Sequence, residues 1–222
     1  MRVLAIGDIH GCSGALDALL SAVAVQPDDT LVTLGDYVDR GPDSRGVLDR
    51  LIALCRSRYV VALRGNHDQM MVQARDGGEA LLNWRSSGGD TTETSYGGLG
   101  AVPAEHWRFI KDQCVDCWET ETHIFAHASV YADLPLFEQP SYVLHWGRLD
   151  KAKPHESGKV MVCGHASQKD GVPLNLGFAV CIDTWAYGGG WLSCLDVTSG
   201  QVWQANQSGQ QRQFWLESPP VP

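Results

Sequence analysis

The chain contains 222 residues, of which 26 are acidic and 17 are basic, so its formal net charge at pH 7 is −9. An apolar fraction of 44% with a charged fraction of 19% is typical of a folded protein and excludes an intrinsically disordered chain. The acidic balance argues against binding nucleic acid through a basic face, and no stretch approaches the roughly 20 apolar residues that a membrane helix needs.

The first third of the chain alternates short apolar runs with helical patterns. Residues 3–6, 31–34 and 59–63 are continuous apolar runs, which are typical of strands buried on both faces. Between them, apolar side chains recur at helical spacing and predict helices over residues 13–25 and 43–55. The resulting βαβαβ order predicts an α/β fold whose sheet is partly parallel.

Residues 69–119 break this pattern and are predicted to form an insertion that lies over the sheet. The segment opens as a helix and then passes through glycine-rich stretches at residues 86–89 and 95–98. A second helix is predicted over residues 104–112.

The last part of the chain is rich in predicted strands. Residues 123–126, 160–163 and 179–182 repeat the pattern of buried strands. Residues 191–195 and 201–204, with a Thr-Ser-Gly turn between them, predict a β-hairpin.

We expect one domain over residues 1–217 and a loose tail at 218–222, whose prolines cannot continue a helix or a central strand. Because an acid occurs already at Asp8, we expect no signal peptide and a cytoplasmic protein. The seven cysteines are an odd number and are expected to be reduced. Cys114 and Cys117 have the spacing of a metal or redox pair, but one such pair is a weak signal.

Chemically distinctive residues follow five of the predicted strands. Three are the motifs Gly7-Asp8-Ile9-His10-Gly11, Gly35-Asp36-Tyr37-Val38-Asp39-Arg40-Gly41 and Arg64-Gly65-Asn66-His67-Asp68. Ligands bind at the carboxyl ends of strands in open α/β sheets, so we expect these residues to gather at one edge. Carboxylates, imidazoles and an amide suit borderline divalent metals, and six ligands fit two ions that share a carboxylate. The predicted ligands are Asp8, His10, Asp36, Asn66, His127 and His165.

This ordered set of motifs resembles the calcineurin-like metallophosphoesterases, and more narrowly the phosphoprotein phosphatase family with its bacterial and bacteriophage lambda members. The resemblance implies a four-layered β-sandwich flanked by helices, with a dinuclear metal site at its rim. It implies that one ion is bound by Asp8, His10 and Asp36, and the other by Asp36, Asn66, His127 and His165. Manganese is the first candidate for both ions, with iron, zinc, cobalt and nickel as alternatives. A hydroxide held between the ions would attack phosphorus directly, without a phospho-enzyme.

The resemblance also implies that His67 is the general acid and that Asp39 positions it. The chemistry gives an independent argument, because a departing alkoxide needs a proton that an imidazolium held by a carboxylate can give.

Three arginines match the phosphate-binding arginines of the family, namely Arg40, Arg64 and Arg148. Guanidinium groups suit the oxygens of a phosphoryl group, whose charge must be stabilised in the transition state. The assignment of Arg148 rests on the sequence Trp146-Gly147-Arg148, which lies between the two late histidines.

We expect the substrates to be phosphomonoesters on phosphoserine or phosphothreonine proteins, with phosphotyrosine and small phosphate esters left open. The main alternative is a symmetrical diadenosine tetraphosphate hydrolase, whose bacterial form usually lacks the acid at the position of Asp39 and has an apolar residue at that of Arg64. A cyclic nucleotide phosphodiesterase and an inactive scaffold are further alternatives. Asp68 replaces the Glu that protein phosphatases usually carry, a change that affects the substrate rather than the chemistry. We expect neither nucleic-acid nor membrane partners, and the sequence fixes no oligomeric state.

We expect most of the remaining aromatic residues and histidines to have structural roles. Trp84 and Tyr96 could stack on a substrate ring, but we expect them to bury the insertion against the sheet. Trp185 and Tyr187 precede a run of glycines and are candidates for the rim of the site. We expect structural roles for His106, His123, His145 and His155.

Overall fold

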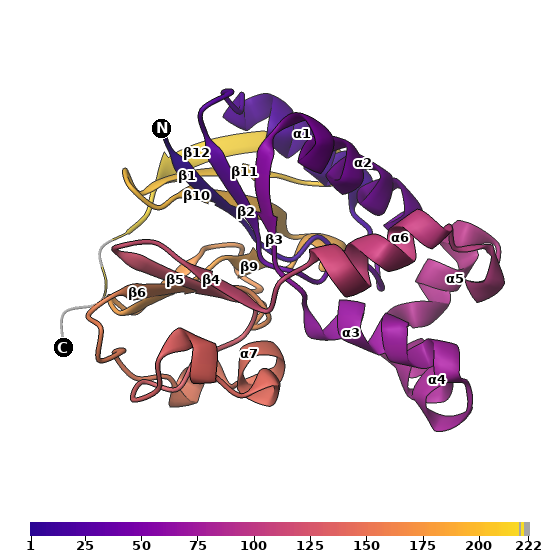
Figure 1. The fold of residues 1–222 in the computed structure, drawn as a ribbon. Helices are drawn as coiled ribbons and strands as arrows, with labels where there is room; N and C mark the ends of the chain where they lie inside the picture. Colours follow the sequence, from indigo (N-terminus) through magenta and orange to yellow (C-terminus); the bar gives the residue numbers. More distant parts are fainter. Residues whose placement is uncertain (218, 220–222) are drawn as a thin grey trace.

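The computed structural model describes residues 1–217 and 219, and two β-sheets lie between layers of helices (Figure 1). The predicted loose tail falls largely outside this part of the chain, because residues 218 and 220–222 are not described. None of the helices in the described residues combines the length and the apolar character that crossing a bilayer requires.

The first sheet combines both ends of the chain. Its parallel part consists of β2 (Thr30–Thr33) between β1 (Val3–Ile6) and β3 (Tyr59–Ala62). The free side of β1 pairs antiparallel with β10 (Trp191–Asp196), which is followed by β11 (Gln201–Ala205) and β12 (Gln211–Trp215). The short β9 (Asp183–Thr184) also pairs with β10. The pairing of β10 with β11 confirms the predicted hairpin.

The second sheet takes its strands from the later part of the chain. Its order is β4 (Cys117–Glu119), β5 (His123–Ala126), β6 (Val160–Cys163), β8 (Ala179–Cys181) and β7 (Leu174–Asn175). The three central strands β5, β6 and β8 are parallel. The expectation of one sheet edge is therefore corrected: the strand ends that carry the motifs belong to two sheets.

Side chains along each strand alternate between two cores. In β1, Leu4 and Ile6 join the core beneath the helices, whereas Ala5 joins the core that both sheets share. In β5, Phe125 joins the shared core, whereas its neighbour Ile124 joins a third core that includes residues of α7 (Ser141–Trp146). The order of layers is thus helix, sheet, sheet and helix, which confirms the predicted four-layered α/β architecture.

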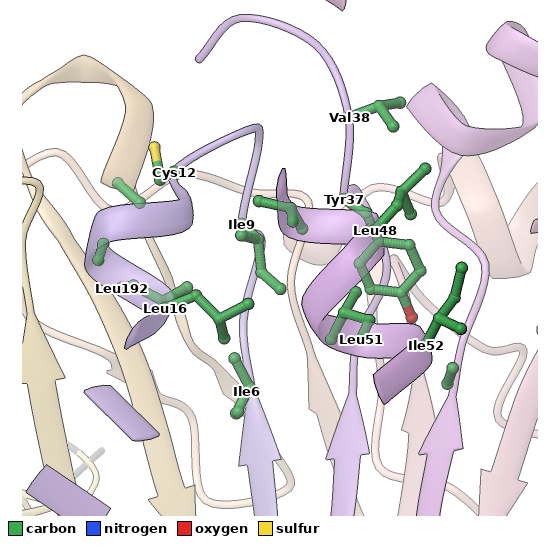
Figure 2. Close-up of a cluster of buried hydrophobic side chains, with 14 of the residues drawn as sticks. Ile6, Ile9, Cys12, Leu16, Tyr37, Val38, Leu48, Leu51, Ile52 and Leu192 are labelled. Atoms are coloured by element: carbon green, nitrogen blue, oxygen red, sulfur yellow. The ribbon is translucent and has the colours of Figure 1, made fainter. Parts of the chain in front are cut away.

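Two helices cover the outer face of the first sheet, α1 (Ser13–Val23) and α2 (Ser44–Ser57). Figure 2 shows Leu16 of α1 and Leu48 of α2 among the side chains that pack above Ile6. Helix α1 ends two residues earlier than predicted, because Ala24 adopts a left-handed conformation with φ of 48°.

The segment predicted as an insertion is helical and lies beside both sheets (Figure 1). It contains α3 (Asn66–Gln73), α4 (Gly78–Trp84), α5 (Asp90–Tyr96) and α6 (Ala104–Arg108), and α6 continues into a π-helical turn over Phe109–Gln113. Residues 117–119 instead form β4, so the helical segment ends before the second sheet begins. Its first helix carries Asn66 and His67 in its first turn, which links the segment directly to the third motif.

Candidate metal centre

The predicted ligands follow β1, β2, β3, β5 and β6, in loops except for Asn66, which begins α3. Backbone hydrogen bonds join the loops after β1 and β2 and the loops after β5 and β6. The N–H groups of Ile9 and His10 donate to the carbonyl oxygen of Asp36 at 3.1 and 2.8 Å. In the second sheet, the N–H of Gly164 donates to the carbonyl oxygen of His127 at 2.8 Å. Within each sheet, these bonds hold two neighbouring loops together.

The backbone of these loops adopts an unusual conformation. Among the residues that the structure describes, seven other than glycine have positive φ. Five of the seven are predicted site residues: His10, Asp36, Asp39, Arg40 and His165. Such conformations cost about 1 kcal/mol or more each and concentrate at functional sites. The strain thus coincides with the chemistry that the sequence indicates.

Asp36 lies at the centre of the cluster. Its Oδ2 is 3.3 Å from Nε2 of His10, and its Oδ1 is 3.5 Å from Nε2 of His127. Two groups of side chains could hold an ion, His10 with Asp36 and His67, and Asp8 with Asp36 and His127. Asp36 belongs to both groups, as a carboxylate shared between two ions would.

Two of the histidines have a fixed orientation. Nδ1 of His10 donates to the carbonyl oxygen of Val38, and Nδ1 of His127 donates to that of Leu34, each at 2.8 Å. A backbone acceptor at Nδ1 leaves Nε2 as the free ligand atom, which is the usual arrangement of a metal-binding histidine. In both residues this free nitrogen faces Asp36.

Asn66 brings an amide oxygen between two histidines. Its Oδ1 lies 2.9 Å from Nε2 of His127 and 3.0 Å from Nδ1 of His165. With Nδ1 of His127 protonated and the ring neutral, Nε2 of His127 and Oδ1 of Asn66 are both acceptors, so their close approach favours a cation. The residues present thus fit a divalent metal ion.

Asp8 joins the loops of the two sheets. Its carboxylate accepts the backbone N–H of His165, with distances of 3.2 and 3.0 Å to its two oxygens. A Cβ at position 164 would lie 1.9 Å from Oδ1 of Asp8, so Gly164 permits this approach.

Burial sets the charges of the cluster. It lowers the pKa of His10 to about 3 and that of His165 to about 4, so both rings are neutral ligands at pH 7. Burial, together with Asp183 and Asp36, raises the pKa of Asp8 well above its usual value. Crowded buried carboxylates beside neutral imidazoles are an environment that a divalent cation stabilises.

The predicted catalytic pair is in contact. Nδ1 of His67 donates to Oδ2 of Asp39 at 2.8 Å, and both side chains are buried. Burial opposes the charged form of His67, but Asp36 and the bond to Asp39 outweigh it and raise the pKa of His67. The ring of His67 lies 4.8 Å from the ring of His10, so the pair borders the predicted ligands.

Arg40 reaches the cluster. Its Nη1 lies 2.9 Å from Nε2 of His10, and its guanidinium lies 4.8 Å from the ring centre of Tyr187. The ring of Tyr187 also contacts that of His10 edge to face, with 5.0 Å between centres. Tyr187 therefore lies at the cluster, as expected for a residue of the rim.

The guanidinium of Arg64 bonds to the helical segment, and its phosphate-binding role stays a prediction. Its guanidinium donates to the carbonyl oxygens of Ile110, Lys111 and Cys114 at 3.0, 2.9 and 2.8 Å. A fourth N–H donates to the carboxylate of Asp116 at 2.7 Å. Arg64 therefore joins the end of β3 to the end of the helical segment.

Arg148 lies next to the cluster but outside it. Its side chain is 75% exposed and donates twice to the carboxylate of Asp150, at 2.9 and 2.7 Å. It lines a cavity of about 560 Å³ that extends from His165 over leucine side chains such as Leu149 and Leu174. Arg148 thus borders the space beside His165 rather than the ligands themselves.

Two buried carboxylates have roles that the sequence did not reveal. The carboxylate of Asp68 accepts the N–H groups of Asp36, Tyr37 and Gly65, at 2.8 to 2.9 Å, and so shapes the loop that carries Asp36. Asp183 accepts the hydroxyl of Ser167 at 2.5 Å. No motif marks Asp183, because β9, which carries it, is only two residues long.

Several other side chains singled out in the sequence are buried or hydrogen-bonded within the fold. The seven cysteines, including Cys114 and Cys117, form no disulfide in the structure. Trp84 and Tyr96 are buried, as expected. His106 bonds to the hydroxyl of Tyr96 at 2.7 Å.

Comparison with known proteins adds a family and several relatives. The model of a family described as calcineurin-like phosphoesterase matches residues 1–176. The serine/threonine-protein phosphatase 1 of Salmonella typhimurium is 37% identical over 138 residues, which cover 57% of this chain and 58% of that protein. The symmetrical bis(5'-nucleosyl)-tetraphosphatase of an Acidovorax strain is 45% identical over 78 residues, which cover 35% of this chain and 27% of that protein. The chain thus matches less than two thirds of the length of these relatives.

Solved structures share the fold at low sequence identity. A structure assigned provisionally to a diadenosine tetraphosphatase gives a TM-score of 0.68 at 23% identity, covering 96% of this chain and 93% of that one. A cold-active protein-tyrosine phosphatase from a Shewanella species gives 0.65 at 17% identity, covering 97% and 80%.

Proposed function

Because the chain belongs to the calcineurin-like phosphoesterase family, we propose that it is a metal-dependent phosphatase that hydrolyses phosphomonoesters. One observation carries the proposal: His67, bonded to Asp39, belongs to one of two candidate ligand groups that share Asp36. Hydrolysis of an alkyl phosphate needs both positive charge at the phosphoryl oxygens and a proton for the leaving oxygen. The cluster contains residues suited to both tasks.

The ions would be held by Asp8, His10, Asp36, Asn66, His127 and His165. Bound divalent ions, with manganese as our first choice, would supply positive charge and lower the pKa of an attacking water molecule. Arg40 would bind a phosphoryl oxygen, because its guanidinium already lies beside His10. His67 would give its proton to the departing oxygen, while Asp39 holds the ring and stabilises its charged form. Arg148 would meet the substrate at the entrance to the cavity beside His165.

Phosphoserine or phosphothreonine proteins are our first choice of substrate. The relatives are named both as protein phosphatases and as symmetrical tetraphosphatases, so both classes require a test. An alkoxide is a poor leaving group and benefits strongly from a general acid, whereas a nucleotide phosphate leaves without one. The bond between His67 and Asp39 therefore favours phosphomonoesters. Arg64 no longer helps to distinguish the two classes, because its donors bind the helical segment.

The proposal is tested by hydrolysis after loading the metal-stripped protein with manganese. The substrates are a phosphoserine peptide, a phosphotyrosine peptide, p-nitrophenyl phosphate, diadenosine tetraphosphate and bis-p-nitrophenyl phosphate. Preference for a peptide supports a protein phosphatase. Preference for the dinucleotide supports the tetraphosphatase alternative, and preference for the diester supports a phosphodiesterase. No hydrolysis, together with no bound transition metal, supports an inactive scaffold.

The same assay tests the general acid through His67→Asn. We expect kcat for the phosphoserine peptide to fall by about a hundredfold or more, because the alkoxide loses its proton donor. The loss for p-nitrophenyl phosphate should be much smaller, because nitrophenolate leaves readily. His123→Asn, at the opposite end of β5 from His127, is the matched control. Equal losses on the two substrates would contradict the role of His67.

A further inference from the structure

The carboxylate of Asp39 has partners from the helical segment as well as from His67. Nε1 of Trp84 donates to both carboxylate oxygens, at 2.9 and 3.0 Å. The hydroxyl of Thr92 donates to Oδ1 at 2.8 Å, while His67 bonds to Oδ2. Asp39, Trp84 and Thr92 are each fully buried. Among the residues that the structure describes, the carboxylate bonds to the side chains of His67, Trp84 and Thr92.

The same segment also holds the backbone at this point. The N–H of Asp39 donates to Oγ1 of Thr92 at 2.8 Å, and the N–H of Arg40 donates to the carbonyl oxygen of Gly88 at 3.0 Å. Asp39 and Arg40 have φ of 72° and 67°, a strained conformation that needs such support. A Cβ at position 88 would lie 2.8 Å from Cγ of Arg40, so a glycine there permits the close contact.

We propose that Trp84 and Thr92 are positioning residues for the general acid, which they serve by holding the carboxylate of Asp39 against Nδ1 of His67. A buried carboxylate that can rotate presents its two oxygens to His67 in turn, and each rotation changes the direction of the bond. Two further donors, one from α4 and one from α5, fix a single orientation. They act through Asp39 and do not touch the substrate.

The helical segment would thereby contribute to catalysis as well as to burial of the cluster. Its helices deliver an indole N–H and a hydroxyl to a residue of the second motif, across sequence separations of 45 and 53 residues. An apolar segment would shield the cluster equally well, but it would leave the buried carboxylate with fewer hydrogen-bond donors, which is unfavourable for a buried charge. The inference rests on the proposed function, because it assumes that His67 is the general acid.

The test uses Trp84→Phe, which removes the indole donor, and Thr92→Val, which removes the hydroxyl that donates to the carboxylate and accepts the N–H of Asp39. Thr94→Val is the matched control, because Thr94 lies on α5 and its hydroxyl bonds only to the carbonyl oxygen of Asp90 among the described residues. We expect kcat for the phosphoserine peptide to fall by about tenfold in Trp84→Phe and Thr92→Val. The KM should be unchanged, and the loss for p-nitrophenyl phosphate should be less than about threefold. Thr92→Ser, which retains the hydroxyl, should restore most of the loss.

A second readout does not depend on turnover. The Nδ1–H proton of His67 gives a low-field NMR resonance when it is held by a carboxylate, and His67→Asn identifies the signal. In Trp84→Phe and Thr92→Val this resonance should move and exchange faster with solvent, whereas Thr94→Val should leave it in place. An unchanged resonance, or equal losses on both substrates, would overturn the inference. If the wild-type protein hydrolyses nothing, the proposed function fails, and the resonance alone decides whether Trp84 and Thr92 hold the pair.

Discussion

Asp36 is the residue on which both ligand groups depend. Each of its carboxylate oxygens faces a different histidine, and the backbone N–H of His67 donates to Oδ1 at 2.9 Å. Burial opposes the charge on Asp36, but His127, His67 and His10 together hold its pKa below the usual value. The carboxylate is therefore charged at pH 7 and ready to bind cations.

Replacing this carboxylate should remove both ions. In Asp36→Asn we expect the bound manganese, measured by elemental analysis after dialysis, to fall from two ions per chain to less than one. Turnover should fall by more than about a hundredfold, because both ions lose a ligand. Asp112→Asn is the control, because Asp112 is exposed on the last turn of the helical segment. Retention of two ions by Asp36→Asn would contradict the shared-ligand assignment.

Arg40 and Arg64 should respond to substitution in opposite ways. In Arg64→Met, three backbone carbonyls lose their donor, so we expect the free energy of unfolding to fall by about 2 kcal/mol while KM is unchanged. In Arg40→Met, we expect kcat/KM to fall by about tenfold or more with little change in stability. Thermal melts and steady-state kinetics on both variants measure the contrast. A raised KM in Arg64→Met would instead support the phosphate-binding role of Arg64.

The sequence could predict the residues of the motifs but not all of their partners. Asp8, His10 and Asp36 follow directly from a strand and a sharp turn, so local pattern locates them. Trp84 reaches Asp39 across 45 residues, and no local pattern reports such a contact. Arg64 belongs to the third motif, yet its guanidinium bonds to backbone carbonyls of the helical segment, a contact that only the folded chain reveals.

An ion pair between Arg2 and Asp29 holds the start of β1 in place. Asp29, directly before β2, accepts the backbone N–H of Arg2 at 3.2 Å and its guanidinium at 2.5 Å. The N–H of Gln26 donates to the same carboxylate at 2.7 Å. These bonds hold the start of β1 beside the start of β2.

This pair should make stability depend on pH. The hydrogen bond from Arg2 lowers the pKa of Asp29 from 3.8 to about 2, so its contribution is present above pH 4 and is lost as the pH falls from about 4 to 2. Asp29→Asn should lower the free energy of unfolding by about 1–2 kcal/mol at pH 7 and by almost nothing at pH 2. Urea melts across this range measure the difference. Asp28→Asn, an exposed neighbour, should show little effect at any pH, and a constant difference for Asp29→Asn would contradict the argument.

Three buried strands match the prediction at both ends, whereas the ends of other elements do not. β1, β5 and β6 occupy residues 3–6, 123–126 and 160–163 as predicted, because both faces of each strand are apolar. α1 ends early at a left-handed Ala24, and residues 117–119, predicted to belong to the insertion, are instead a strand of the second sheet. These boundaries depend on backbone geometry and tertiary pairing, which side-chain periodicity does not report.

At the scale of the molecule, the candidate ligands join the two sheets. Asp8, His10 and Asp36 follow strands of the first sheet, whereas His127 and His165 follow strands of the second. Ions bound by both sets would link the sheets in addition to the core that they share. Metal binding should therefore raise the stability of the whole fold.

Chelation should reveal this link. Ligands that bind only the folded state stabilise it by about 2.7 kcal/mol at a free concentration of one hundred times Kd. We expect the melting temperature to rise on adding manganese to the stripped protein and to fall again with a chelator. Asp36→Asn should show a much smaller response. If manganese leaves the melting temperature of the wild-type protein unchanged, this would contradict a site that spans both sheets.

The position of β10 between β1 and β11 has a consequence for how the protein is made. All three N-terminal motifs have left the ribosome once residue 68 and a further stretch have been synthesised, yet β1 then has a neighbour on one side only, β2. Its other partner, β10, is translated more than a hundred residues later. Throughout that interval the growing chain exposes an unpaired strand edge and an incomplete set of ligands, so nascent chains stalled before residue 191 should be the form of this protein that chaperones bind.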